Sequence, residues 1–256
     1  MESMRSRFTA TTSELMDRSD DLALVLADIG VDRFRATGAI ERHGRRIVNV
    51  GIREQLMIGV TAGFAMAGYR PIAHTYAPFL VERAFEQIKL DLVHQGFGAM
   101  LVSIGASFDA AAEGRTHQAP GDVALLATLP DLTIHVPGHA DEVEALLRRG
   151  TTRRRTEYVR LAEGGNLAAH TQAVDGIVTL RRGSASAPAV VAVGPMLDVV
   201  AEATADLDIT LGYAFTVRPI DRAWIRQTGT AEVIIVEPYL EGTSSVELQA
   251  ALSVVR

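Results

Sequence analysis

The chain has 256 residues, of which 48% are hydrophobic and 22% are charged, so it is globular in composition and long enough for a substantial core. Its formal net charge of −6 gives no indication of binding to nucleic acid, and no apolar run reaches the length of a membrane span. The absence of cysteine excludes disulfides, thiolate catalysis and cysteine-ligated metal sites.

The first residues, MESMRSRFTATTSEL, lack the apolar segment of a secretory signal, so we expect a cytoplasmic protein. Five later apolar runs are typical of buried parallel strands: residues 22–29, 46–50, 99–104, 132–136 and 157–161. Helical patterns lie between them over residues 52–67, 79–94 and 140–150. This alternation predicts an α/β fold with a doubly wound, mostly parallel sheet.

The pattern changes after these elements. Residues 163–188 are rich in Gly, Ser and Ala, and they predict a linker with one short strand. Strand patterns return at 189–194, 208–215 and 231–238, and a helical pattern covers 199–207. We therefore predict two domains, residues 1–172 and a smaller α/β domain of residues 173–256.

Glu54 lies where the predicted strand 46–50 gives way to a helix, in the sequence VNVGIREQLMIGV. A carboxylate in the first turn of a helix suits the positive end of the helix dipole, and this alone explains its presence. The other interpretation is a catalytic acid. The stretch by itself leaves both open.

Two later segments also stand at junctions between predicted elements. Tyr76 and Phe79 flank a proline just before a helix; such aromatics usually pack in the core, but they also form walls around flat heterocycles. His117 lies in the loop EGRTHQ, where a histidine is either a surface residue or a ligand contact. Because ligands of α/β sheets bind beyond the carboxyl ends of strands, one parallel sheet could bring all of these residues to the same edge.

Together these segments resemble the transketolase family, from about residue 20 to the end of the chain. The family's motifs occur in the family's order: a strand ending in AD at 27–28, NVGIREQ at 49–55, TYAPF at 75–79 with RAFEQI at 83–88, and GRTHQ at 114–118. The resemblance implies the thiamine diphosphate-binding fold of the pyrimidine type. Residues 189–248 look like the smaller α/β domain at the C-terminus of these proteins.

The resemblance implies an enzyme that uses thiamine diphosphate to transfer a two-carbon ketol unit from a ketose donor to an aldose acceptor, both sugars or sugar phosphates. Glu54 would donate a hydrogen bond to N1′ of the aminopyrimidine ring, a role for which partial burial favours the neutral carboxyl group. Tyr76 and Phe79 match the positions that pack on that ring. Arg83 stands near the place of a third aromatic and is a further candidate contact to the cofactor.

His117 matches the histidine that reaches the substrate, and Arg160 lies near a position that often anchors a substrate phosphate. Glu113 belongs to the substrate candidates because EGRTHQ stands where the family has Asp-Gly-Pro-Thr-His-Gln, so the donor pocket would be reshaped. Residues 103–112, SIGASFDAAA, also lack the basic residue that users of sugar phosphates place there. Losing a cationic anchor weakens the case for a phosphorylated donor.

The family's Gly-Asp-Gly signature, which helps to hold the cofactor diphosphate and Mg²⁺, is absent from the sequence. The resemblance therefore implies the C-terminal half of a split transketolase. An N-terminal-half partner subunit would bind the diphosphate and the Mg²⁺, and this chain would provide no metal ligand. Because pyrimidine domains of the family also pair across a dimer, we expect a 2+2 heterotetramer.

Three alternatives remain open. The beta-type subunit of 2-oxo acid dehydrogenases has the same layout, although the THQ loop and the GIREQ form favour transketolase. Deoxyxylulose phosphate synthase has a similar THQ loop but is normally a single chain. A non-catalytic paralogue acting as a scaffold is supported by the altered loop at 113–115 and opposed by the presence of Glu54 and His117.

Overall fold

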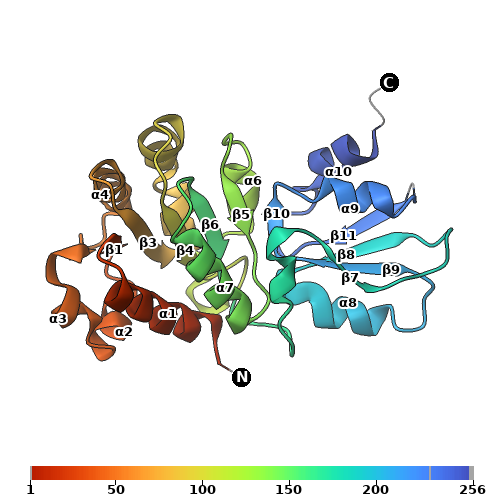
Figure 1. The fold of residues 1–256 in the computed structure, drawn as a ribbon, viewed down its shortest axis with the longest axis horizontal. Helices are drawn as coiled ribbons and strands as arrows, with labels where there is room; N and C mark the ends of the chain where they lie inside the picture. The colour runs from red at the N-terminus through yellow and green to blue at the C-terminus, as the bar shows by residue number, and fades with distance from the viewer. Residues whose placement is uncertain (1, 231, 254–256) are drawn as a thin grey trace.

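The computed structural model describes residues 2–230 and 232–253, which form two α/β units side by side (Figure 1). The first unit contains a seven-stranded sheet in the order β10-β5-β6-β4-β3-β1-β2. The second contains a four-stranded sheet in the order β11-β8-β9-β7. The doubly wound, mostly parallel sheet followed by a smaller α/β unit, as predicted from the sequence, is confirmed.

Six strands of the large sheet are parallel: β1 (Leu22–Leu26), β2 (Ile47–Asn49), β3 (Arg70–Tyr76), β4 (Met100–Ile104), β5 (Thr133–His135) and β6 (Glu157–Arg160). The seventh, β10 (Thr216–Arg218), runs antiparallel to β5. The α-helices of this unit are α1 (Met4–Arg18), α2 (Val31–Ala36), α3 (Ala39–His43), α4 (Glu54–Met66), α5 (Phe85–Gln87), α6 (Asp122–Leu126) and α7 (Ala140–Gly150). Its 3-10 helices are η1 (Gly44–Arg46) and η4 (Ala111–His117). Two π-helical segments, η2 (Pro78–Glu82) and η3 (Ile88–His94), flank α5 and complete the helix predicted at 79–94.

Alternate residues of the strands feed two separate cores, one on each face of the sheet. Leu24 of β1 packs in a core with residues of α1, α2 and α7. Its neighbour Val25 packs on the opposite face, in a core with residues of α4, η2, η3 and α6. Because both faces of this parallel sheet are buried, side chains on both sides of each strand are apolar. The strands therefore appear in the sequence as continuous apolar runs.

The central strand β3 and the helix α1 were not among the predicted elements. The sequence of β3 contains Arg70, Pro71 and His74, which are unusual in a buried strand. The structure satisfies the two basic residues internally. Arg70 donates to the carbonyl oxygen of Gly150 at 2.7 Å, and the Nδ1 atom of His74 lies 2.9 Å from the carbonyl oxygen of Val102.

The second unit is built from β7 (Val178–Arg181), β8 (Ala189–Val193), β9 (Thr210–Ala214) and β11 (Val233–Val236), with α8 (Leu197–Ala203), α9 (Arg222–Gln227) and α10 (Ser245–Leu252). The 3-10 helices η5 (Thr171–Asp175) and η6 (Gly194–Met196) precede β7 and α8. Helix α8 covers one face of the small sheet, and α9 and α10 cover the other (Figure 1). Within the described ranges, no helix is long and apolar enough to span a membrane.

A buried carboxylate joins the two units. Glu142 of α7 accepts hydrogen bonds from the hydroxyl of Tyr213 at 2.7 Å and from the backbone N–H groups of Gly138 and His170, both at 2.8 Å. The side chain of Glu142 is fully buried. Because a buried charge is costly unless it is well hydrogen-bonded, this network favours one arrangement of the two units.

Candidate functional site

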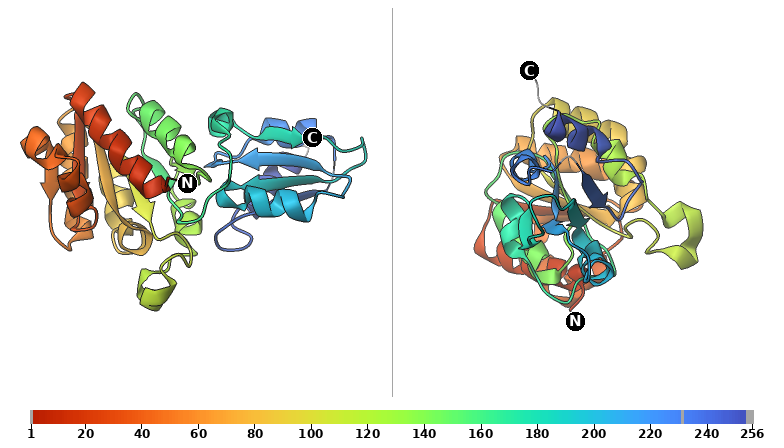
Figure 2. Two further views of the ribbon diagram at one scale, coloured as in Figure 1. Left: turned by 90° about the horizontal axis from the view of Figure 1, so that it is seen from below. Right: turned by 90° about the vertical axis from the view of Figure 1, so that its right-hand side faces the viewer.

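The carboxyl ends of the parallel strands carry the segments that the sequence singles out. The chain leaves β2, β3 and β4 at this edge through residues 50–53, 77 and 105–110, since parallel strands all end on the same side. Helix η4, in the loop that follows β4, projects away from the body of the molecule (yellow-green in Figure 2). Ligands of open α/β sheets bind at such an edge.

A hydrogen-bonded turn places Glu54 at this edge. The Oδ1 atom of Asn49 accepts from the backbone N–H groups of Asp28 at 2.9 Å and Gly51 at 3.1 Å. Gly51 has φ of +71°, a conformation that glycine adopts without steric cost. The turn lets α4 begin at Glu54, two residues later than the predicted start of the helix.

The side chain of Glu54 is 1% exposed, and Arg83 is its partner. The Nη1 atom of Arg83 donates to Oε2 of Glu54 at 2.6 Å, and Nε2 of Gln55 donates to the backbone carbonyl oxygen of Arg83 at 3.1 Å. An unpaired buried carboxylate would be costly, so the arginine stabilises it. An interaction with the helix dipole alone does not require this degree of burial.

Three rings stand next to this ion pair. The rings of Tyr76 and Phe79 are 5.9 Å apart, and the ring of His117 lies 5.5 Å from the first and 5.0 Å from the second, all edge to face. The guanidinium carbon of Arg83 lies 4.3 Å from the centre of the Phe79 ring. These contacts connect Glu54, through Arg83, to His117 on the projecting loop.

A glycine makes room for one of these rings. Gly105 has φ of +71°, and a Cβ atom at this position would lie 2.5 Å from Cδ1 of Tyr76. No side chain fits there without displacing the ring. The start of the loop after β4 is therefore shaped around Tyr76.

The cluster has the chemistry to bind a flat nitrogen heterocycle. Aromatic faces and edges pack well on such a ring, and a buried carboxyl group recognises a ring nitrogen by a single hydrogen bond. Glu54, Tyr76, Phe79, Arg83 and His117 are all predicted site residues, and the structure brings these five together.

Arg160 and Glu113 lie outside this cluster. Arg160 is buried, and its Nε donates to Oδ2 of Asp122 at 2.8 Å while its Nη2 donates to Oγ of Ser107 at 2.7 Å. It thus contacts the His117 loop at Ser107, which lies at the base of that loop. Glu113 is exposed on η4, and its described side-chain atoms take part in no hydrogen bond or ion pair.

Two further arginines, Arg5 and Arg33, were not among the predicted site residues, and the charge of Arg5 interacts with Tyr76. Burial lowers the pKa of Arg5, the nearby charge of Arg33 lowers it further, and Tyr76 and Glu163 act in the opposite sense. The Nε atom of Arg5 is buried without a hydrogen-bond partner, and within the described chain no carboxylate ion-pairs with either arginine. The sequence offered little indication of a role for these arginines, because Arg5, in MRSRF, precedes the first family motif and Arg33 lies in a short helix. Arg5 and Arg33 lie close enough for their charges to repel each other, and Glu163 offsets part of this repulsion at Arg5.

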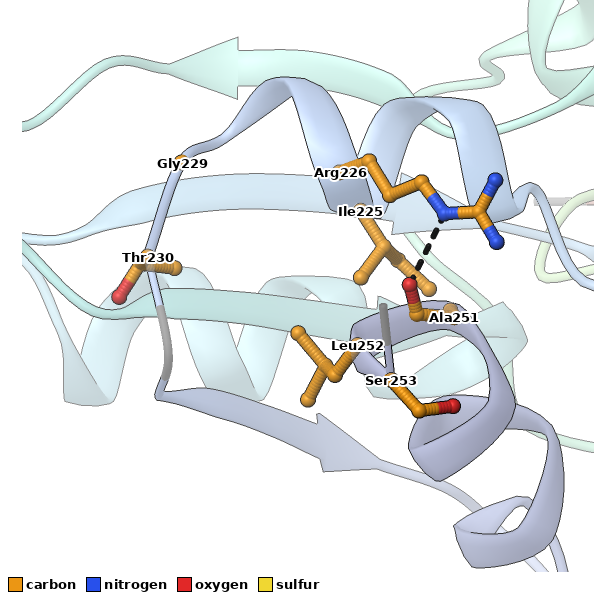
Figure 3. A pocket seen from close by; sticks show the side chains of 7 residues that line it. All are labelled: Ile225, Arg226, Gly229, Thr230, Ala251, Leu252 and Ser253. Carbon is orange, nitrogen blue, oxygen red and sulfur yellow. Dashed lines mark hydrogen bonds between the residues drawn. The ribbon is translucent and has the colours of Figure 1, made fainter. Parts of the chain in front are cut away.

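A separate cavity of about 620 Å³ lies between the ends of α9 and α10 (Figure 3). It is lined by Ile225, Arg226, Gly229, Thr230, Ala251, Leu252 and Ser253. Arg226 is the one charged residue of this lining, and its Nε atom donates to the carbonyl oxygen of Ala251 at 3.0 Å. In the part of the chain that the structure describes, no group of three or more His, Asp or Glu side chains is arranged to hold a metal ion.

Comparison with known proteins identifies the family of the first unit. The family described as transketolase, pyrimidine binding domain, matches residues 2–166. An uncharacterised 33.6 kDa protein in the fasciation locus of Rhodococcoides fascians is 41% identical over 253 residues, which cover 97% of this chain and 80% of that protein.

Two further similarities concern an enzyme and a fold. The 1-deoxy-D-xylulose-5-phosphate synthase of Renibacterium salmoninarum is 29% identical over 189 residues, covering 71% of this chain but 28% of the enzyme. A solved structure described as a split gene transketolase, inactive beta4 tetramer, aligns with a TM-score of 0.82 at 23% identity, covering 98% of this chain and 84% of that one. The chain thus spans less than a third of that synthase and most of the split-gene subunit.

Proposed function

The chain belongs to the transketolase family through its pyrimidine-binding domain, and on this premise we propose that it is a subunit of a thiamine diphosphate-dependent transketolase. The reaction is the transfer of a two-carbon ketol unit from a ketose donor to an aldose acceptor. The observation that carries the proposal is the buried Glu54 beside the rings of Tyr76, Phe79 and His117.

These residues fit the aminopyrimidine end of the cofactor. When bound, thiamine diphosphate supplies an acyl carbanion equivalent, which is the difficult part of ketol transfer. Tyr76, Phe79 and Arg83 would hold the ring. Arg83 occupies Oε2 of Glu54, which leaves Oε1 to share a proton with the ring nitrogen N1′. His117, at the rim of the same cluster, would exchange a proton with a substrate hydroxyl.

The proposal also concerns the residues that could bind a charged group of the substrate. Arg160 is neutralised by Asp122, so it is a weaker anchor for an anion than its position in the sequence suggests. Arg5 and Arg33 form no ion pair of this kind among the described residues, although Glu163 acts on Arg5 in the opposite sense to Arg33. These two arginines would suit an anionic group on the substrate, whereas the carboxylate of Glu113 on the loop would instead accept hydrogen bonds from substrate hydroxyl groups.

A second polypeptide completes the proposed enzyme. The sequence has no Gly-Asp-Gly signature, so we propose that an N-terminal-half partner holds the diphosphate and Mg²⁺ in a 2+2 heterotetramer. The similarity to a split-gene transketolase subunit supports this arrangement. The proposal includes a cytoplasmic location and a boundary near residue 172 between the pyrimidine-binding and C-terminal domains.

Glu54→Gln tests the catalytic assignment in the assembled enzyme. The amide cannot exchange a proton with N1′, so we expect ketol transfer to fall by about 10²-fold or more. Glu86→Gln, an exposed position on the helical segment that carries Arg83, is the matched control and should keep full activity. Far-UV circular dichroism should show both variants folded. Near-normal activity of Glu54→Gln would contradict the proposal.

The similarity to 1-deoxy-D-xylulose-5-phosphate synthase supports a second candidate, condensation with a 2-oxo acid donor. The two reactions differ in the donor, because only the 2-oxo acid releases carbon dioxide. Assaying the assembled enzyme with a ketose phosphate and with a 2-oxo acid in parallel separates them. Release of carbon dioxide with no ketol transfer would favour the second reaction.

A further inference from the structure

The loop that carries Glu113 and His117 is closed at its base. The backbone N–H of Ala119 donates to the carbonyl oxygen of Ser107 at 3.0 Å, and the two residues form an isolated antiparallel bridge. Between them the chain extends outward through η4, which bends at Gly114. A loop closed only by such a bridge would still be free to tilt about its base.

The second unit holds this base from outside. The hydroxyl of Ser107 donates to the carbonyl oxygen of Pro238 at 2.5 Å, and the backbone N–H of Leu240 donates to the carbonyl oxygen of Pro120 at 2.7 Å. The two bonds reach both ends of the loop from one short segment. We call this segment, residues 237–240 after β11, the strap.

Tyr239, in the middle of the strap, is buried in the core beneath α6. The guanidinium carbon of Arg160 lies 5.8 Å from the centre of its ring, and Arg160 in turn donates to Ser107. Ser244 donates to a carboxylate oxygen of Glu237 at 2.6 Å and lies 3.3 Å from the Tyr239 hydroxyl, so the strap is also braced from behind. Two direct contacts, and one through Arg160, therefore connect the strap to the base of one loop.

We propose that the strap sets the position of the His117 loop, with Ser107 and Tyr239 as positioning residues. The second unit thereby contributes to a site whose reacting groups all come from the first. Each contact removes conformational freedom from the loop base, so His117 is held against Tyr76 and Phe79 before any ligand binds. The catalytic meaning of this arrangement rests on the proposed function, but the restraint on the loop does not.

Hydrogen exchange of the full chain tests the restraint without cofactor or partner. In Ser107→Ala we expect amides of residues 107–119 to exchange at least about tenfold faster, because the variant loses both the bond to the carbonyl oxygen of Pro238 and the bond from Arg160. Strand β8 should exchange at the wild-type rate. Tyr239→Ala should have the same local effect, whereas Tyr239→Phe keeps the ring under Arg160 and should match the wild type.

A second measurement follows His117 itself. In the wild type, the ring currents of Tyr76 and Phe79 should shift the imidazole proton resonances, and Ser107→Ala should move these resonances toward their values in an unstructured peptide. Tyr239→Phe keeps the ring beside Arg160, so it is the control.

Two outcomes would overturn the proposal that the strap positions the His117 loop. One is unchanged exchange and unchanged His117 resonances in Ser107→Ala. This variant is milder than Tyr239→Ala and decides the matter if Tyr239→Ala does not fold. The other is equal acceleration in the loop and in β8, since this indicates a loss of overall stability alone. Neither result would contradict the proposed function. Conversely, an assembled enzyme that is inactive in ketol transfer would contradict the proposed function but not the restraint of the loop by the strap.

Discussion

At the scale of single residues, two buried histidines make the fold sensitive to acid. Burial lowers the pKa of His74 to about 3 and that of His135 to about 3, from an ordinary value of 6.5. Between these values the unfolded chain binds a proton at each histidine and the folded chain does not. The free energy of unfolding is therefore highest above about pH 6.5, and each histidine lowers it by about 1.4 kcal/mol per pH unit as the pH falls toward 3.

His74→Asn tests this. Asparagine can donate to the carbonyl oxygen of Val102 but does not titrate, so the dependence of unfolding free energy on pH should become less steep by about 1.4 kcal/mol per unit. Urea unfolding at several pH values between about 4.5 and 7 measures the slope. Equal slopes in the variant and the wild type would show that His74 titrates normally in the folded chain.

The place of single residues along the chain was predictable, but their contacts with distant residues were not. The motif around Glu54 predicted its place at the start of a helix, because turn and strand signals are local. Its ion pair with Arg83 joins residues 29 positions apart, and the pair between Arg160 and Asp122 joins residues 38 positions apart. No local pattern encodes such contacts. Arg5 escaped attention for the same reason, since only the folded chain brings it near Tyr76.

At the scale of elements, most strands were predictable because both faces of a parallel sheet are apolar. Strand β3 was the exception, since Arg70 and His74 interrupt its apolar pattern and find their partners in neighbouring parts of the fold. Helix α4 was predicted, but its start moved from residue 52 to 54 because the turn at Gly51 takes up the intervening residues. Polar residues within β3 and the turn before α4 thus limited the prediction of elements more than the apolar strands did.

Gly105→Ala tests how the end of β4 shapes the site. The new Cβ would lie 2.5 Å from the Tyr76 ring, so the variant should lose about 1–3 kcal/mol of unfolding free energy through overpacking, in addition to the strain of an alanine at φ of +71°. Gly96→Ala is a matched control, because Gly96 has φ of +72° but no atom within 4 Å of the added Cβ. It bears the same backbone strain, of about 1–2 kcal/mol, without the contact. Equal losses in the two variants would show that Tyr76 is not seated against Gly105.

At the scale of the whole molecule, the two units are interlocked. The antiparallel strand β10 follows β9 of the second unit in the sequence but completes the sheet of the first. The proposed boundary near residue 172 therefore leaves one strand of the first sheet in the second segment. Sequence patterns did not reveal this exchange, because a three-residue strand has no periodicity of its own. With the Glu142 network and the strap, it couples the second unit to the sheet that carries the site.

The proposed division of the cofactor site predicts how the chain behaves alone. The proposed site has aromatic side chains for a pyrimidine ring, and no group of three or more His, Asp or Glu among the described residues is arranged to hold a metal ion. Mg²⁺ should therefore not strengthen binding of thiamine diphosphate to the isolated chain. Calorimetric titration of the isolated chain should give the same weak affinity with Mg²⁺ and with a chelator. Adding the partner that carries the Gly-Asp-Gly signature should raise the affinity at least about 100-fold and make it dependent on Mg²⁺.

Phe79→Ala in the complex should weaken binding, because the partner cannot replace an aromatic wall of this chain. Tight, magnesium-dependent binding by the isolated chain would contradict a site divided between two polypeptides.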